Sequence, residues 1–177
     1  MISTERIRIV PFEMKYLDDY FNGFNSEITK YQWPDPFESM DDARATLQHF
    51  LDEMEREETL VSVILSAQGE FLGSVEVHGL PGDCPELGVW ITAPAQRKGY
   101  AYEALNAMLD NVRSKYDKTV FYYEADVRNA GSTKLLRKFE KSYEIIEQGL
   151  ESVTTDSGKQ LELQGYILKA KETVPAV

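Results

Sequence analysis

The chain has 177 residues, of which 42% are hydrophobic, and its formal net charge is -11. This length suits one domain spanning residues 1–177, and the longest apolar runs, such as 60–65, are far shorter than the ~20 residues of a membrane-spanning helix. The excess of carboxylates repels phosphate backbones, so we expect cationic amines as partners and neither nucleic acid nor a membrane.

Hydrophobic periodicity continues along almost the whole chain and predicts elements in the order β-α-α-β-β-β-α-β-α-β-β. In chain order these elements cover residues 7–10, 14–24, 43–54, 60–65, 71–77, 86–91, 101–112, 119–127, 135–139, 143–147 and 161–168. Ser39 followed by Asp42 resembles a helix capping box, and Gly69 lies in the turn of a predicted antiparallel hairpin. The order predicts an α+β fold with a mixed sheet.

The loop between strand 86–91 and the next helix has the features of an anion-binding site. Residues 96–101 read Gln-Arg-Lys-Gly-Tyr-Ala and lead into the helix, so their backbone N–H groups have no intrahelical acceptor. Gly99 permits close approach of a phosphate to the backbone, and the two basic residues before it make this patch positive. The competing interpretation is an ordinary strand-to-helix turn.

This hexapeptide resembles the Gln/Arg-x-x-Gly-x-Gly/Ala signature of the GNAT superfamily of N-acetyltransferases. The segment 28–37 and the helix start Asn129-Ala130-Gly131-Ser132 look like the branch that acetylates ribosomal-protein N-termini, together with its small-amine relatives. The resemblance implies a three-layer fold in which helices flank a mixed, mostly antiparallel central sheet. It also implies acetyl transfer from acetyl-CoA to a small-molecule amine or a peptide N-terminus.

By the same resemblance, a set of backbone and side-chain groups would bind CoA, the loop holding its pyrophosphate and Asn129 its pantetheine arm. These residues are Ile91, Thr92, Gln96, Arg97, Lys98, Gly99, Tyr100, Ala101 and Asn129. The chain departs from the family pattern at Leu136, where many members carry a tyrosine that reprotonates the leaving thiolate. Ser142-Tyr143 replaces the Gly-Phe that usually ends this helix.

Acetyl transfer needs a neutral amine, yet an alkyl amine of pKa ~10.4 is only about one part in 2,500 neutral at pH 7. Glu86 is the candidate general base, because it begins the strand before the loop and shares a face with Gly88 and Trp90. The competing interpretation is a solvated glutamate at a strand end. Alternatives on neighbouring strands are Glu76, His78, Glu124 and Asp126.

Ser132 is the candidate acid for the departing sulfur by resemblance, or else the N-cap or a first-turn hydroxyl of the helix. Trp33 and Phe37 are candidates for the wall of the acceptor pocket, or else core aromatics. A basic group on the later helix is a candidate for contact with the CoA 3′-phosphate, or else a solvated face. Its members are Arg128, Lys134, Arg137, Lys138 and Lys141.

The remaining features narrow the class of protein. Cys84 is the single cysteine, so no internal disulfide can form, and no Cys/His spacing suits a metal. Residues 1–6 lack the features of a signal peptide, which predicts a cytoplasmic protein, either a monomer or a homodimer. The alternatives to an enzyme are a non-catalytic acyl-CoA sensor and a nucleotide-binding protein, although the loop lacks the Lys-Ser/Thr ending of a P-loop.

Overall fold

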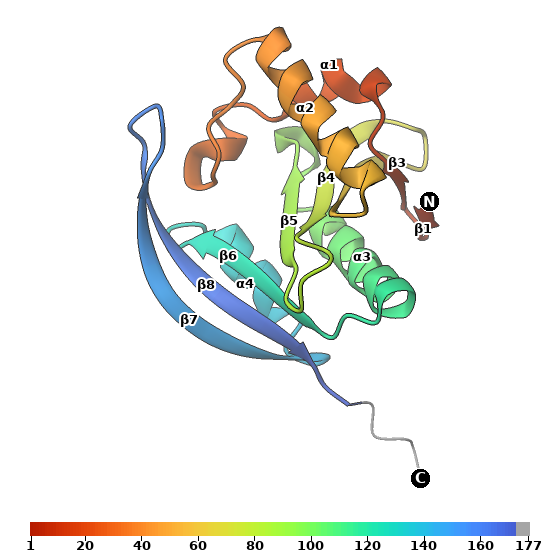
Figure 1. Cartoon of the computed structure of the whole chain (residues 1–177), viewed down its shortest axis with the longest axis vertical. Helices are drawn as coiled ribbons and strands as arrows, with labels where there is room; N and C mark the ends of the chain where they lie inside the picture. The colour runs from red at the N-terminus through yellow and green to blue at the C-terminus, as the bar shows by residue number, and fades with distance from the viewer. Residues whose placement is uncertain (173–177) are drawn as a thin grey trace.

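The computed structural model describes residues 1–172, in which eight strands form one sheet with the spatial order β1-β2-β3-β4-β5-β6-β8-β7 (Figure 1). The strands are β1 (Ile2–Ser3), β2 (Ile7–Pro11), β3 (Thr59–Ser66), β4 (Phe71–His78), β5 (Glu86–Ile91), β6 (Val120–Asp126), β7 (Tyr143–Thr154) and β8 (Gln160–Ala170). All neighbouring strands are antiparallel except β5 and β6, which are parallel. The predicted mixed, mostly antiparallel sheet is confirmed.

Helices cover both faces of the sheet and give the molecule three layers (Figure 1). They are α1 (Leu17–Gly23), α2 (Met40–Glu55), α3 (Tyr100–Tyr116) and α4 (Ala130–Arg137), with 3-10 turns η1 (Met14–Tyr16), η2 (Ile28–Tyr31) and η3 (Ala93–Ala95). Apolar side chains of α3 and α4 share one core with Val75, Leu87 and Phe121 of the sheet, whereas α1 and α2 pack with Val61 and Val63 on the other face. The predicted α+β fold with flanking helices is confirmed.

Side-chain caps begin two of the helices. Ser39 Oγ accepts a hydrogen bond of 3.1 Å from the Asp42 N–H at the start of α2, which confirms the predicted capping box. At the start of α4 the cap is Asn129, whose Oδ1 accepts a hydrogen bond of 3.1 Å from the Ser132 N–H, so Ser132 lies in the first turn and is not the cap. Each bond satisfies a backbone donor that the helix cannot satisfy itself. None of the helices in residues 1–172 combines the length and the apolar character that crossing a membrane requires.

The ends of the sheet differ most from the sequence prediction. The two-residue strand β1 was not predicted, because it is too short to show alternation. The predicted helix 14–24 is divided into η1 and α1. The last two strands are both longer than predicted. For β7 the reason is that its outer part is largely exposed on both faces, so its apolar residues show no regular period.

The pairing of the sheet is interrupted between β5 and β6. β4 pairs with β5 over six residue pairs, and β8 pairs with β6 over seven, but β5 and β6 share a single pair, Glu86 with Tyr122. The Tyr122 N–H donates to the Pro85 carbonyl at 3.0 Å, and beyond this point the two strands diverge. Backbone N–H and C=O groups along the facing edges are therefore available to a ligand.

Candidate active site

A cavity of about 620 Å³ lies where β5 and β6 diverge. Its walls come from the end of β5 (89–91), the loop before α3, the start of α4 and the η2 segment. This volume lies within the range of about 300–1,000 Å³ typical of sites for small molecules and cofactors. The cavity thus joins the predicted anion-binding loop to the open edges of the two strands.

The donor loop, residues 96–101, has the backbone geometry of an anion site. Arg97 and Gly99 adopt the left-handed conformation, with φ angles of 61° and 88°. The Gln96 side chain donates to the Ile91 carbonyl at 3.1 Å and fixes the entry to the loop. Helical hydrogen bonding starts with the Glu103 N–H, which donates to the Gly99 carbonyl at 3.1 Å, so the first amides of α3 remain available to a bound anion.

Most of the residues expected to bind CoA lie together on the cavity wall. They are Ile91, Gln96, Arg97, Gly99, Tyr100, Ala101 and Asn129. Thr92 and Lys98 are not among the lining residues. The Thr92 N–H donates to the Leu72 carbonyl at 2.8 Å, and the Lys98 carbonyl accepts from Arg6 at 2.9 Å, so both of these backbone groups have partners within the protein.

The start of α4 brings Asn129 and Ser132 to the same cavity. Because Asn129 Oδ1 caps the helix, its amide NH₂ is the part of the side chain left to contact a ligand. The Ser132 hydroxyl lies beside the Tyr123 phenol. Burial raises the pKa of this phenol, and the contact with Ser132 offsets only part of the rise. Leu136, which stands where many family members carry the tyrosine that reprotonates the thiolate, is buried in the core.

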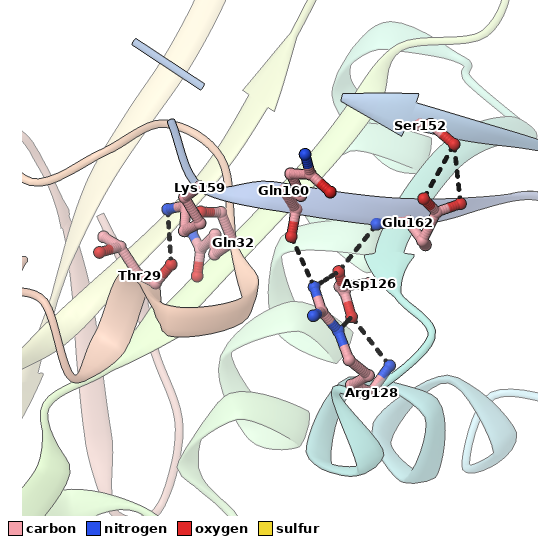
Figure 2. A network of polar contacts seen from close by, with 8 residues as sticks. All are labelled: Thr29, Gln32, Asp126, Arg128, Ser152, Lys159, Gln160 and Glu162. Carbon is pink, nitrogen blue, oxygen red and sulfur yellow. Dashed lines mark hydrogen bonds and ion pairs between the residues drawn. The ribbon is translucent and has the colours of Figure 1, made fainter. Parts of the chain in front are cut away.

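Asp126 and Arg128 form the ion pair that holds the β6–α4 turn (Figure 2). Asp126 is fully buried and accepts hydrogen bonds from Arg128 Nε at 2.7 Å and from the Glu162 N–H at 2.9 Å. Hydrogen bonding to Arg128 lowers the pKa of the Asp126 carboxyl to about 2. Arg128 also donates to the Gln160 carbonyl at 2.8 Å. These contacts leave Asp126 poorly suited to act as a base, and they fix the position of Arg128, which also lines the cavity.

Glu76 is likewise committed to internal contacts. Its carboxylate accepts from the Tyr20 hydroxyl and from Ser74 Oγ at 2.7 Å, and it lies 3.0 Å from His78 Nε2. Burial alone would raise the pKa of the Glu76 carboxyl, but the hydrogen bonds and the His78 charge lower it. Burial opposes protonation of His78, yet Glu76 raises the pKa of the imidazole. This pair is therefore held in its ionised form.

Glu86 and Glu124 differ from those two carboxylates, because burial raises the pKa of each. Glu86 lies where β5 and β6 meet; part of its side chain is exposed, but the surrounding atoms still remove enough water from its carboxyl to raise the pKa, the charge of Glu124 raises it further, and His78 opposes the shift. The Tyr122 hydroxyl donates to Glu124 at 3.2 Å, and burial with the charges of Glu124, Glu86 and Glu151 raises the pKa of Tyr122 to about 12. This carboxylate group is suited to attract a cation and to accept its proton.

The positive charges on the cavity wall come from the donor loop and from the start of α4. Arg128, Lys134 and Lys138 line the cavity with Arg97, whereas Arg137 and Lys141 do not. Three of the five residues predicted to meet a phosphate therefore line the cavity, although Arg128 is also paired with Asp126. In residues 1–172, no cluster of three His, Cys, Asp or Glu side chains is arranged to hold a metal ion.

The segment between α1 and α2 contributes to the cavity through residues that were not predicted. Ile28, Tyr31 and Gln32 line it, whereas Trp33 is 59% exposed. Phe37 packs against the Phe24 ring, with 5.7 Å between ring centroids. Neither Trp33 nor Phe37 lines the cavity, and only the aromatic character of Tyr31 could have marked it from sequence.

Lys159, near the tip of the β7–β8 hairpin, holds this segment in place (Figure 2). Its Nζ donates to the Thr29 and Gln32 carbonyls at 2.8 Å each and lies 3.1 Å from Asp35 Oδ1. Asp35 also accepts from the Ser157 N–H at 3.0 Å. Burial opposes ionisation of Asp35, but hydrogen bonds from Thr155, Ser157 and Lys159 hold the pKa of its carboxyl below the usual range.

Comparison with known proteins gives a consistent result. The family model described as an acetyltransferase (GNAT) domain matches residues 6–140. No curated protein matches the chain. The crystal structure of spermidine N-acetyltransferase from Vibrio cholerae with CoA and spermine has a TM-score of 0.77 at 21% identity, covering 94% of this chain and 97% of that one. The structure of an acetyltransferase from Salmonella typhimurium that modifies the N-terminal serine of ribosomal protein L7/L12 has a TM-score of 0.78 at 14% identity, covering 95% of this chain and 97% of that one.

Proposed function

The chain belongs to the acetyltransferase (GNAT) domain family and is an acetyl-CoA-dependent N-acetyltransferase; we propose that it transfers the acetyl group directly to the primary amine of a small cationic molecule. The observation that carries this proposal is the divergence of β5 and β6 between an anion-binding loop at one end and Glu86 at the other. Glu86 does not line the cavity, whose β5 wall begins at Val89, so the proposal is that a bound donor extends from the loop past this wall to the point where the strands meet.

The donor would bind along this cleft from the loop toward its closed end. The pyrophosphate would accept hydrogen bonds from the first amides of α3, while Lys134 and Lys138 supply positive charge. The pantetheine arm carries amide groups that suit the unpaired edges of β5 and β6, in the manner of an added strand. An arm entering from the loop would direct its thioester toward Glu86 and Tyr122, where the strands meet.

The acceptor would approach from the face that carries α1 and α2, because Glu86 shares that face with Trp90, which packs in the core beneath these helices. Glu86 would take a proton from the ammonium, and the neutral nitrogen would then attack the thioester carbonyl carbon. As the C–N bond forms, the C–S bond breaks, the electron pair leaves with sulfur, and the nitrogen must lose its second proton to become the amide. Ser132, on the cavity wall, would protonate the departing thiolate and be reprotonated by the proton that the nitrogen releases. A thiol of pKa ~8.5 can also leave without an acid, in which case that second proton passes to solvent.

Two considerations favour a small cationic acceptor over a peptide N-terminus. First, the carboxylates around Tyr122 attract positive charge. Second, a base such as Glu86 is of most use to an alkyl amine, which holds its proton more tightly than an α-amine of pKa ~7.7–8.0 does. One protein of similar structure was crystallised with spermine, and another modifies the N-terminus of a ribosomal protein, so both acceptor types occur on this fold.

The test is to incubate the purified protein with acetyl-CoA and separate acceptors: polyamines, amino acids, aminoglycosides, and peptides with a free N-terminus. Release of free thiol and the mass gain of one acetyl group are measured for each. We expect acetylated polyamines or other alkyl amines to form fastest. Faster acetylation of peptides would overturn the proposed acceptor class, and CoA binding without transfer to any amine would instead indicate a sensor.

A further inference from the structure

Arg6 lies in the turn between β1 and β2, yet its side chain reaches the donor loop 90 and more residues later in the chain. Its Nη1 donates to the Lys98 carbonyl at 2.9 Å, and its Nε donates to Glu103 Oε2 at 2.8 Å. The guanidinium also lies over the Tyr100 ring, 4.9 Å from its centroid. One side chain thus contacts three residues around the start of α3.

The contact with Lys98 fixes the orientation of one peptide in the loop. Because a trans peptide directs its C=O and N–H to opposite sides, a carbonyl turned toward Arg6 turns the Gly99 N–H away from it. Gly99 lines the main cavity on one side and faces Arg6 on the other, where an added Cβ would lie 3.3 Å from Arg6 Nη2. Arg6 therefore supports the loop from behind, and the Gly99 amide is presented toward the cavity.

The contact with Glu103 has an electrostatic consequence. Glu103 lies in the first turn of α3, where its charge would repel an incoming anion. Its carboxylate accepts from the Thr4 hydroxyl and forms an ion pair with Arg6. Burial opposes ionisation, but Thr4 and Arg6 lower the pKa of this carboxyl. The acid is therefore ionised, and Arg6 supplies the compensating charge.

We propose that Arg6 is a positioning residue for the acetyl donor: it orients the Lys98–Gly99 peptide and neutralises Glu103, so that the start of α3 accepts the pyrophosphate of CoA. The inference rests on the proposed function for the identity of the anion. It assigns no contact between Arg6 and the donor, since the loop lies between them.

The experiment compares Arg6→Gln with the parent protein on two donors, acetyl-CoA and acetyl-pantetheine, which lacks the pyrophosphate. Loss of a charge-assisted hydrogen bond predicts a KM for acetyl-CoA raised about 10- to 100-fold, with kcat nearly kept. The kcat/KM for acetyl-pantetheine should stay within about twofold, because that donor does not use the loop. Arg8→Gln, an exposed arginine two residues later, is the matched control and should leave both donors unaffected.

Calorimetric titration with CoA separates this inference from the proposed function, because it needs no turnover. Weaker CoA binding by Arg6→Gln supports the inference even if no acceptor amine is found. The double variant Arg6→Gln/Glu103→Gln should recover part of the lost affinity, since it removes the uncompensated charge. Equal losses with both donors, or unchanged CoA affinity in a folded Arg6→Gln protein, would overturn it.

Discussion

The donor side and the acceptor side of the cleft are built in different ways. The proposed donor side comes from two continuous stretches, residues 89–101 and the start of α4 at 128–138, and the first is shaped by left-handed backbone angles and a helix start. The proposed acceptor side combines η2, the start of β5 at Glu86, β6 and the β7–β8 hairpin, and long-range contacts such as that of Lys159 with Thr29 hold η2 and the hairpin together. The two sides should therefore respond to different kinds of change: backbone strain on the donor side and loss of a side-chain contact on the acceptor side.

Charge separates the two sides as well. Lys134 and Lys138 line the donor region, whereas Glu86 and Glu124 lie beside Tyr122 at the closed end of the cleft. A positive site suits a phosphate-bearing donor, and a negative site suits a cationic acceptor. This difference predicts that single substitutions will alter the KM of one substrate and leave that of the other nearly unchanged.

The largest effect is expected for Glu86→Gln with an alkyl-amine acceptor. Loss of a general base should lower kcat/KM about 10²–10³-fold, but for an α-amine acceptor it should lower it about tenfold or less, because that amine is partly neutral already. Raising the pH toward 9.5 should partly rescue the variant, since solvent then supplies neutral amine. The measurement is kcat/KM against pH with one acceptor of each kind.

Glu151→Gln removes a charge from the same carboxylate group and serves as the control, because Glu151 contributes to the field around Tyr122 but lies on β7. Parallel pH profiles for Glu86→Gln and the parent would assign Glu86 a purely electrostatic role. The acceptor side would then attract the substrate without supplying its base, and Glu124 would be the next candidate.

A smaller but still large effect is expected from Gly99→Val on the donor side. A β-branched residue at a φ of 88° carries strain of about 1–3 kcal/mol and places its Cβ against Arg6, so CoA affinity should fall about 10- to 100-fold. Calorimetric titration with CoA measures the loss. Gly79→Val is the matched control, because Gly79 also has a positive φ of 65° but lies in a turn away from the cavity. Comparable CoA affinity in Gly99→Val and the control would contradict the assignment of the loop.

Lys159→Met tests whether long-range contacts shape the acceptor side. It removes two hydrogen bonds to backbone carbonyls and the pairing with Asp35, so we expect a KM for the acceptor raised several-fold and a lower Tm. The KM for acetyl-CoA should change by less than about twofold. Lys169→Met, an exposed lysine on β8, is the control and should change neither. A raised KM for acetyl-CoA alone would reverse the assignment of the two sides.

The smallest effect is expected from Ser132→Ala. A leaving thiol of pKa ~8.5 needs little help, so kcat should fall by less than about tenfold while CoA affinity is kept. The Ser132 N–H still donates to Asn129 in this variant, so the helix start is preserved. An unchanged kcat would leave Ser132 with only the backbone role at this helix start.

Features that depend on neighbouring residues could be predicted from the sequence alone. Periodicity and turn residues located the central strands and most of the helices, and the capping box at Ser39 lies where α2 begins. The donor loop could be recognised because its chemistry is contained in six consecutive residues. The composition also indicated a cationic partner before any site was known.

Contacts between segments far apart in the chain could be seen only in the folded structure. Arg6 contacts Lys98, and Lys159 contacts Thr29, through pairings that no local pattern encodes. Burial and partners also separated the candidate bases: Asp126 and Glu76 have pKa values lowered by their hydrogen-bond partners, whereas Glu86 and Glu124 have raised ones. A carboxylate's proton affinity depends on its surroundings in space, so residue type and position along the chain could nominate Glu86 but could not distinguish it from its neighbours.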